Sequence, residues 1–224
     1  MKQGITVNLL ILGLFIGFSC KAYAYDNGDF QVWNTDIEEW KINDSSKLAL
    51  EEEFRWGDNA NQLYYHHYDI AFIYALNKKL DVGLSYRHIY ERKKGKFRIE
   101  NEPNINVTYK WEFVGFKFSD RNRFEYRHFS YQTDSFRYRN MLTIRFPWKF
   151  TRLEIQIYLA DDIFISSIGT AFNNNRFYSG LSFNLTKNLK GEVYYLLQHT
   201  RTVSKKSTDW PHVNVFGTKL KILF

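Results

Sequence analysis

The feature that most constrains this chain is an alternation of apolar and polar side chains with a period of two residues. Its clearest example is the C-terminal stretch 213–224, where aromatic and aliphatic residues share one face and lysines lie on the other. Because a β-strand places successive side chains on opposite faces, this pattern predicts a strand with one apolar face. The apolar face of such a strand could contact membrane lipid or the core of a soluble protein. How often the pattern recurs along the chain must decide between these two environments.

The alternation recurs in blocks of roughly ten residues from Lys47 to the C-terminus, as expected of strands that cross a bilayer. The mean hydropathy of -0.46 excludes a bundle of membrane helices, because each such helix needs about 20 apolar residues. Aromatic residues make up 19% of the chain, which fits pleated strands and the aromatic girdles of membrane barrels. We therefore expect an all-β fold, a transmembrane, antiparallel, up-and-down β-barrel of about ten strands, or twelve if the N-terminal segment adds to the wall.

A soluble sandwich or a lipocalin-like barrel could show the same alternation, with an apolar interior and a wet exterior. Two features of the blocks favour the membrane barrel instead. The apolar faces carry aromatic residues at both of their ends, and the polar faces carry Arg and Glu together. The polar face is therefore expected to point into the lumen and the apolar face toward lipid.

The N-terminus has the three parts of a secretory signal peptide. Lys2 supplies a positive start, residues 5–19 form a short apolar run, and Ala22-Tyr23-Ala24 is a small-x-small cleavage site. A membrane anchor and lipid attachment at Cys20 are the weaker alternatives. We predict a signal peptide of residues 1–24, followed by a single domain of residues 25–224 in the outer membrane of a Gram-negative bacterium.

Removal of this segment changes the charge and the cysteine content. The formal charge of +7 loses the contributions of Lys2 and Lys21, so 7 minus 2 leaves +5. Cys20 is the only cysteine, so the mature chain could form no disulfide. Its stability is expected to come from the strand ladder, the core and the membrane.

The predicted connections alternate between short and long, which is typical of outer-membrane barrels with tight periplasmic turns and larger external loops. The short ones are expected at Asn77, Gly115, Trp148 and Lys187. The longer ones are expected near Gly57, Lys94, Gln132, Asn174 and Ser204. The three longest are predicted to span residues 92–101, 161–175 and 199–211.

The N-terminal segment 25–46 is ambiguous. The blocks from Lys47 onward give an even number of strands, which would place both termini in the periplasm. Within residues 29–42, however, both faces mix aromatic or aliphatic residues with acidic or amide side chains. This segment either packs in or under the lumen, or it forms an extra strand of a barrel of about twelve.

Several charged and aromatic blocks resemble domain-of-unknown-function family 2490, a set of predicted bacterial outer-membrane barrels. These blocks are Glu51-Glu52-Glu53-Phe54-Arg55, Asp120 to Arg127, Arg137-Tyr138-Arg139-Asn140 and Asn175 to Leu181. The resemblance covers nearly the whole mature chain and implies a barrel, but it brings no activity or catalytic residues.

The C-terminal strand also resembles the signal by which the outer-membrane assembly machinery recognises its substrates. The residues that carry this resemblance are Phe216, Leu220, Ile222 and Phe224. The assembly machinery and outer-membrane lipid are therefore the expected partners.

The polar faces concentrate arginine on two consecutive blocks, which antiparallel pairing would bring onto one inner wall. In an open lumen these side chains would favour carboxylate or phosphate solutes. Alternatively, glutamates on the polar faces could pair with the arginines and close the lumen. A barrel of about ten to twelve strands is intermediate in width: barrels of about eight strands have an interior filled by side chains, and much larger ones enclose a water-filled channel. The residues expected to face the lumen are Glu51, Glu53, Arg55, Arg87, Arg121, Arg123, Glu125, Arg127, Arg137, Arg139, Arg145, Lys219 and Lys221.

Catalytic and cofactor chemistry has little support in the sequence. His67 and Asp69 share the expected inner face and Ser85 lies on the next strand, which leaves a Ser/His/acid hydrolase as a minor alternative. The mature chain has no Cys, no clustered His and no Gly-rich phosphate loop, so we predict no metal and no cofactor. The positive charge is spread around an inner wall, so we predict no nucleic-acid partner.

The leading hypothesis is a non-enzymatic outer-membrane barrel that passes small, anionic solutes through an Arg-rich lumen. The alternative is a closed structural or interaction barrel, with the long loops contacting partners in the cell envelope. The third and least supported hypothesis is an outer-membrane lipid hydrolase.

Overall fold

The computed structural model describes residues 27–169, 172–203 and 208–224. The predicted signal peptide, residues 1–24, lies outside the described residues. Within the described ranges, no helix is long and apolar enough to span a membrane.

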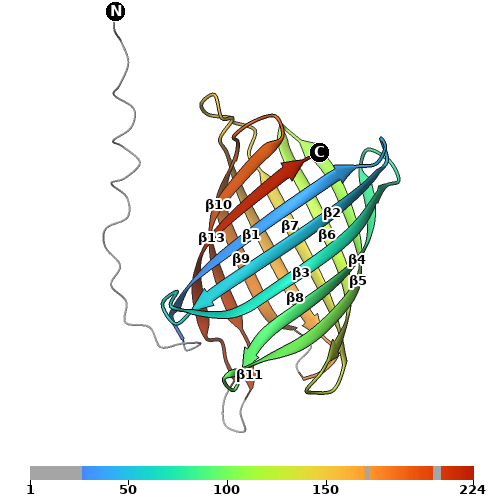
Figure 1. Cartoon of the computed structure of the whole chain (residues 1–224). Helices are drawn as coiled ribbons and strands as arrows, with labels where there is room; N and C mark the ends of the chain where they lie inside the picture. The colour runs from blue at the N-terminus through green and yellow to red at the C-terminus, as the bar shows by residue number, and fades with distance from the viewer. Residues whose placement is uncertain (1–26, 170–171, 204–207) are drawn as a thin grey trace, which may run out of the picture.

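Eleven strands of the described chain close into a single barrel, and a short two-stranded sheet of β11 and β12 extends from one rim (Figure 1). The predicted all-β barrel is confirmed, and its strand number lies between the ten and twelve expected. The barrel strands are β1 (Asp29–Lys41), β2 (Ser46–Gly57), β3 (Gln62–Ala75), β4 (Leu80–Lys93), β5 (Lys96–Phe113), β6 (Phe116–Phe129), β7 (Ser135–Arg145), β8 (Gln156–Ser166), β9 (Phe172–Asn184), β10 (Leu189–Thr200) and β13 (His212–Leu223). The two short strands are β11 (Thr202–Val203) and β12 (Thr208–Asp209).

The odd strand number follows from the way β1 closes the barrel. β1 pairs antiparallel with β2 and parallel with β13, from Asp29 opposite Val213 to Glu39 opposite Leu223. Residues 29–41 of the ambiguous segment are therefore a strand of the barrel wall and do not pack in the lumen. The barrel closes with eleven strands, so no twelfth strand is needed to pair with this segment. The ten barrel strands from β2 onward begin and end at the same rim, as their even number predicted, whereas β1 adds an eleventh strand that starts at the opposite rim, because it runs parallel to β13 (Figure 1).

The two rims differ in which chain end they carry. We call the rim where β1 begins the N-terminal rim; among the described residues it holds 58–61, 94–95, 130–134, 167–169, 201–203 and 208–211. The opposite C-terminal rim holds Phe224 and the connections 42–45, 76–79, 114–115, 146–155 and 185–188. Phe224 stacks on Trp40 there, with ring centroids 5.3 Å apart.

The predicted contrast between short and long connections is only partly present. Residues 92–101 and 161–175, expected as loops, are mostly strand, whereas the turn expected at Trp148 is the long connection 146–155. At Lys94-Gly95 and Val114-Gly115 both residues have positive φ, as in the type I′ turns that join strands of a hairpin. Residues 201–211 remain a long connection, as predicted.

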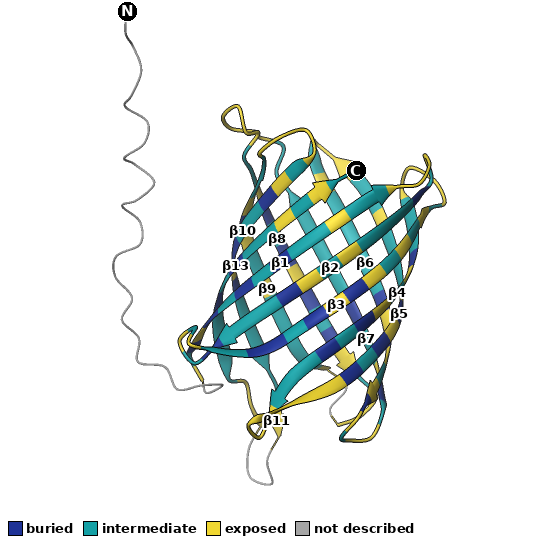
Figure 2. Cartoon of the chain, in the orientation of Figure 1, coloured by how far each residue is buried: buried dark blue, intermediate teal, exposed yellow. Residues whose placement is uncertain are grey.

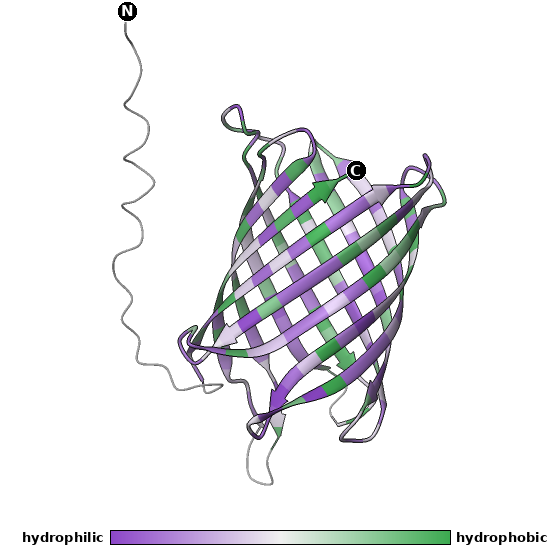
Figure 3. Ribbon diagram, viewed as in Figure 1, coloured by the Kyte–Doolittle hydropathy of each residue, from purple (hydrophilic) through white to green (hydrophobic). Residues whose placement is uncertain are grey.

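Exposure alternates along the strands, and so does hydropathy (Figures 2 and 3). On β6, Arg123 and Glu125 are 7% and 1% exposed, while Phe124 between them is 57% exposed. Phe136 on β7 is 64% exposed. This is the reverse of the usual arrangement in water, where charged residues are almost never fully buried unless paired.

Glycines on the inner face make room for aromatic rings from the neighbouring strand. Gly217 on β13 lies opposite Tyr194 on β10, and a Cβ added at Gly217 would overlap the Tyr194 ring. The substitution Gly217→Ala is expected to lower the free energy of unfolding by about 1 to 3 kcal/mol, because the buried ring must move. Denaturant titration of the folded protein in lipid vesicles measures this loss.

Gly83→Ala is the matched control for this prediction. Gly83 also lies within a strand, but the nearest atom to its added Cβ is the Phe72 carbonyl oxygen at 3.5 Å, an ordinary contact. We expect no loss of stability there. Equal losses in both variants would show that any glycine in the wall is required and that the ring at Tyr194 is irrelevant.

Candidate functional site: the charged interior

Ion pairs between strands that are not neighbours identify the inner face of the barrel. Arg137 on β7 bonds Glu102 on β5 at 2.8 Å, and Arg145 on β7 bonds Glu192 on β10 at 2.7 Å. Side chains converge on the concave side of a closed sheet and diverge on its convex side. Contacts that skip a strand are therefore made inside the barrel.

The arginines predicted on β6 and β7 lie inside, but most are already paired. Arg127 makes a two-point contact with Glu100, the second bond at 3.0 Å. Arg137 donates to Glu125 as well as to Glu102, and Arg139 donates to Asp162 at 2.6 Å and to Glu125 at 3.3 Å. The predicted arginine ladder is therefore neutralised along much of its length.

Arg121 and Arg123 are the least neutralised members of the predicted ladder. Arg123 donates to the side-chain oxygen of Asn106 at 2.6 Å and lies 3.7 Å from Glu125. Arg121 donates to the sulfur of Met141 at 3.2 Å and forms no ion pair with any residue that the structure describes. Both line a small cavity of about 290 Å³.

The remaining predicted lumen residues also lie inside and form ion pairs. The contacts are Arg55 with Glu53 at 2.5 Å, Arg87 with Glu51 at 3.5 Å, Lys219 with Glu192 at 3.6 Å and Lys221 with Glu39 at 2.7 Å. The structure thus places every predicted lumen residue on the inner wall and gives nearly all of them a partner of opposite charge.

Several acidic partners were not among the predicted site residues. Glu100 and Glu102 on β5 and Asp162 on β8 are nearly or fully buried and bond the predicted arginines. Glu100 and Asp162 fell within segments expected to be loops, and Glu102 directly follows one of them. The signal that could have found them is the alternation itself, which continues through both segments.

We call the densest part of this network the central belt. It runs around the inner wall from β3 to β8, and Glu102 and Asp162 within it are 0% exposed. Each carboxylate of the belt contacts at least one guanidinium. The belt consists of Asp69, Arg87, Glu102, Arg123, Glu125, Arg137, Arg139 and Asp162.

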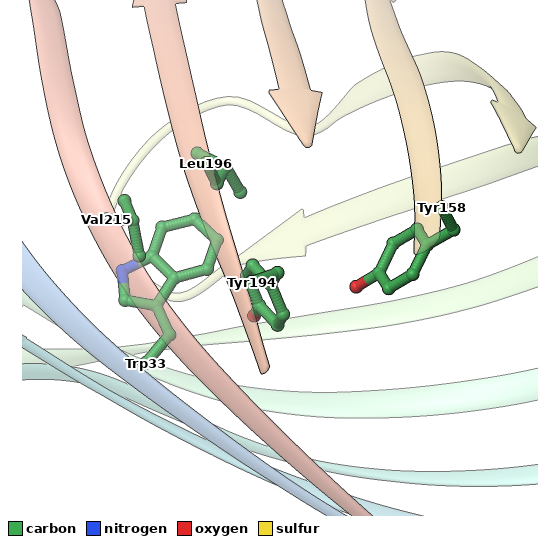
Figure 4. Close-up of a cluster of buried hydrophobic side chains, with 5 residues drawn as sticks. All are labelled: Trp33, Tyr158, Tyr194, Leu196 and Val215. Carbon is green, nitrogen blue, oxygen red and sulfur yellow. The ribbon is translucent and has the colours of Figure 1, made fainter. Parts of the chain in front are cut away.

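An aromatic cluster continues the wall where the belt ends. Trp33, Tyr158, Tyr194, Leu196 and Val215 are buried together, and Figure 4 shows the Tyr158 ring pointing toward the others. They come from β1, β8, β10 and β13. Arg145 stacks over Tyr158 with 5.0 Å between its guanidinium carbon and the ring centroid, so the charged and aromatic parts of the interior are in contact.

Separate cavities lie toward the two rims. The N-terminal cavity has a volume of about 800 Å³ and is bordered by Lys94 and Gly95 of the β4–β5 turn. The C-terminal cavity has a volume of about 550 Å³ and is bordered by Lys149 and Glu154. The two share no lining residue within the described ranges, and belt residues lie at the inner limit of the N-terminal cavity.

The residues of the hydrolase alternative do not form a Ser/His pair. The Ser85 hydroxyl donates to Asn104 at 2.7 Å, while Nε2 of His67 lies 3.0 Å from Glu51. Asp69, the expected acid, bonds Arg87 at 3.0 Å. The described residues also contain no group of His, Cys, Asp and Glu arranged to hold a metal ion.

The loop 130–134 at the N-terminal rim is fixed by one carboxylate. Asp134 accepts hydrogen bonds from His128 at 2.9 Å, from the Tyr126 hydroxyl at 2.6 Å and from the backbone of Phe129 at 3.0 Å. These hydrogen bonds, with that from His128 the largest, lower the pKa of Asp134 to about 2.

The residues of the predicted assembly signal lie on the outer face of β13, or just beyond its end. Leu220, Ile222 and Phe224 are exposed on the outside of the barrel, and Phe216 is half-buried on the same face. This face is continuous with the exposed aromatic and aliphatic residues of the rest of the outer wall.

Comparison with known proteins places the chain in one family. A family model described as "Protein of unknown function (DUF2490)" matches residues 30–209, from the second residue of β1 to the end of β12. No curated protein matches the chain.

Proposed function

The chain belongs to the DUF2490 family of proteins of unknown function, and from its own geometry we propose that it is an outer-membrane β-barrel closed at mid-height. In this proposal the barrel does not pass solutes by diffusion. It serves as a closed structural or interaction barrel of the cell envelope, the alternative that the sequence left open.

The outer wall supports a membrane location. A closed barrel leaves no free sheet edge, and its exposed side chains are mostly Phe, Tyr, Leu and Ile. Such a surface is far larger than the apolar patches of soluble monomers, and it suits contact with lipid. We assign the C-terminal rim to the periplasm, where the assembly machinery would meet the face of Phe216, Leu220, Ile222 and Phe224.

The observation that carries the closed state is the burial of the central belt. In a water-filled pore, charged side chains at mid-height would remain in contact with solvent. Here Glu102, Glu125 and Asp162 are almost without solvent contact and are held by arginines from neighbouring strands and from strands further along the wall. Together with the aromatic cluster, the belt reduces the interior between the two rim cavities to the small cavity of about 290 Å³, which shares Arg87 with the N-terminal cavity and Lys221 with the C-terminal cavity.

The anion channel is less well supported by this arrangement. Its selectivity would depend on the positive charge of Arg137 and Arg139, yet both are bonded to carboxylates. An ion that crossed the belt would have to displace these bonds in a site of low dielectric.

Conductance in a planar bilayer tests the closed state. The folded protein is expected to give no current above that of the bare bilayer, with folding checked on the same sample by resistance to protease. Stepwise currents from the wild-type protein would contradict the proposal. If they occur, a shift of the reversal potential toward cations in the variant Arg121→Ala, Arg123→Ala would favour the anion channel instead.

A further inference from the structure

One arginine deep in the barrel has a guanidinium without a carboxylate partner at the wall of the N-terminal cavity. Arg176 on β9 forms no ion pair with any described residue. Of the predicted ladder, only Arg121 shares this property, and it lines a different cavity. The surplus charge at Arg176 is therefore a local feature and does not extend around the whole interior.

The guanidinium of Arg176 is held in a fixed position. Its Nε donates to the side-chain oxygen of Gln198 at 2.7 Å. Its central carbon lies 4.9 Å from the ring centroid of Trp33 and 4.7 Å from that of Phe164. This leaves the terminal nitrogens of Arg176 without a hydrogen-bond partner in the described chain, although a guanidinium has five donors.

Asp162 lies opposite Arg176 on the neighbouring strand β8, but it bonds Arg139 at 2.6 Å and forms no ion pair with Arg176. Arg55 lies 3.8 Å from the same Trp33 ring, and Arg139 lies 4.3 Å from the same Phe164 ring. The acidic residues that line the cavity are Glu91, Glu100 and Glu102, and they bond Lys93, Arg127 and Arg137. The wall near Arg176 therefore has a net positive charge.

A second unsatisfied group lies beside Arg176. Asn174 precedes it by two residues on the same strand, so both side chains point inward. The amide nitrogen of Asn174 donates to Thr200 at 3.0 Å, while its buried oxygen has no partner. A buried acceptor without a donor is unfavourable, and a ligand hydroxyl could satisfy it.

From these observations we infer that the N-terminal cavity binds a small hydroxylated oxyanion, such as a sugar phosphate or a hydroxycarboxylate. The terminal nitrogens of Arg176 bind the oxyanion, and Asn174 accepts a hydrogen bond from a hydroxyl. A volume of about 800 Å³ is within the range of small-ligand pockets. This inference goes beyond the proposed closed barrel. It rests on that proposal in one respect only, namely that the N-terminal cavity ends at the central belt and does not continue through the barrel.

Isothermal titration calorimetry on the folded protein in detergent tests this site, with glucose 6-phosphate, inorganic phosphate and glucose as probes. Glucose 6-phosphate is expected to bind most tightly, phosphate more weakly and glucose not at all. Arg176→Gln is expected to weaken the binding of glucose 6-phosphate at least tenfold, and Arg176→Lys to restore part of it.

Arg121→Gln is the matched control, because it removes a buried arginine that also lacks an ion pair but lines a different cavity, and it should leave binding unchanged. The proposal is overturned if the folded wild-type protein binds neither anion, if Arg176→Gln binds as the wild type does, or if Arg121→Gln weakens binding equally. A protein that conducts in a bilayer but passes this test would refute the closed state and retain the site.

Discussion

The substitution Glu125→Gln is expected to lower the free energy of unfolding by about 3 to 5 kcal/mol, the largest stability loss that we predict for a single residue. Glu125 is fully buried and bonds both Arg137 and Arg139, with Arg123 3.7 Å away. Gln keeps the shape but removes the negative charge. The guanidiniums would then remain buried without their shared counter-charge, which is far less favourable than leaving them in water.

Denaturant titration of the protein folded in lipid vesicles measures this effect, and Glu91→Gln is its control. Glu91 also pairs with a cation, Lys93 at 2.6 Å, but both side chains are partly exposed near the N-terminal rim. Exposed pairs contribute at most about 1 kcal/mol. If the two substitutions lowered stability equally, the belt would have no special role in holding the barrel together.

Cysteine labelling is expected to place the start of β1 and Phe224 on opposite sides of the membrane. The only cysteine of the chain is Cys20, within the predicted signal peptide, so single cysteines can be introduced without competing thiols. Asn27→Cys and Asp58→Cys lie at the N-terminal rim, and Asp44→Cys lies at the C-terminal rim. A maleimide that cannot cross membranes should label the first two in intact cells and the third only after lysis.

Asp58→Cys is the internal control of this experiment. It reports on the orientation of the barrel, while Asn27→Cys reports on the polarity of β1. Labelling of Asp58→Cys but not Asn27→Cys in intact cells would mean that β1 does not run parallel to β13. Labelling of Asp44→Cys alone in intact cells would reverse the proposed orientation and leave the parallel pair intact.

The barrel and its inner face could be predicted from the sequence because both depend on local periodicity. A period of two residues assigns each side chain to a face whatever its partner strand is, so a set of inward-facing charged residues, such as Glu51, Arg137 and Lys221, could be proposed without knowledge of the strand pairing. The direction of a neighbouring strand leaves no trace in that period. The parallel closure of β1 on β13 was therefore beyond the reach of sequence analysis.

The state of the interior depends on register, which the sequence does not specify. The sequence offered arginines and glutamates on one face, but whether Arg137 meets Glu102 depends on how the strands between them are staggered. Glu100 and Asp162 were missed for a different reason, because runs of charged or polar residues resemble loops. Arg176 was not among the residues predicted to face the lumen, and its lack of a carboxylate partner becomes evident only when the ion pairs of the other described residues are known.

The parallel seam has a consequence for the order in which the barrel assembles. The other ten pairings join barrel strands that follow one another along the chain, with only the short β11 and β12 between β10 and β13, whereas the seam joins the two ends of the barrel. The hydrogen bond from Asn34 to Thr218, for example, bridges 184 residues. Hairpins form first because short loops lose little entropy on closing. The seam therefore closes last. Until it does, β1 and β13 are open edges that can accept a strand from another molecule.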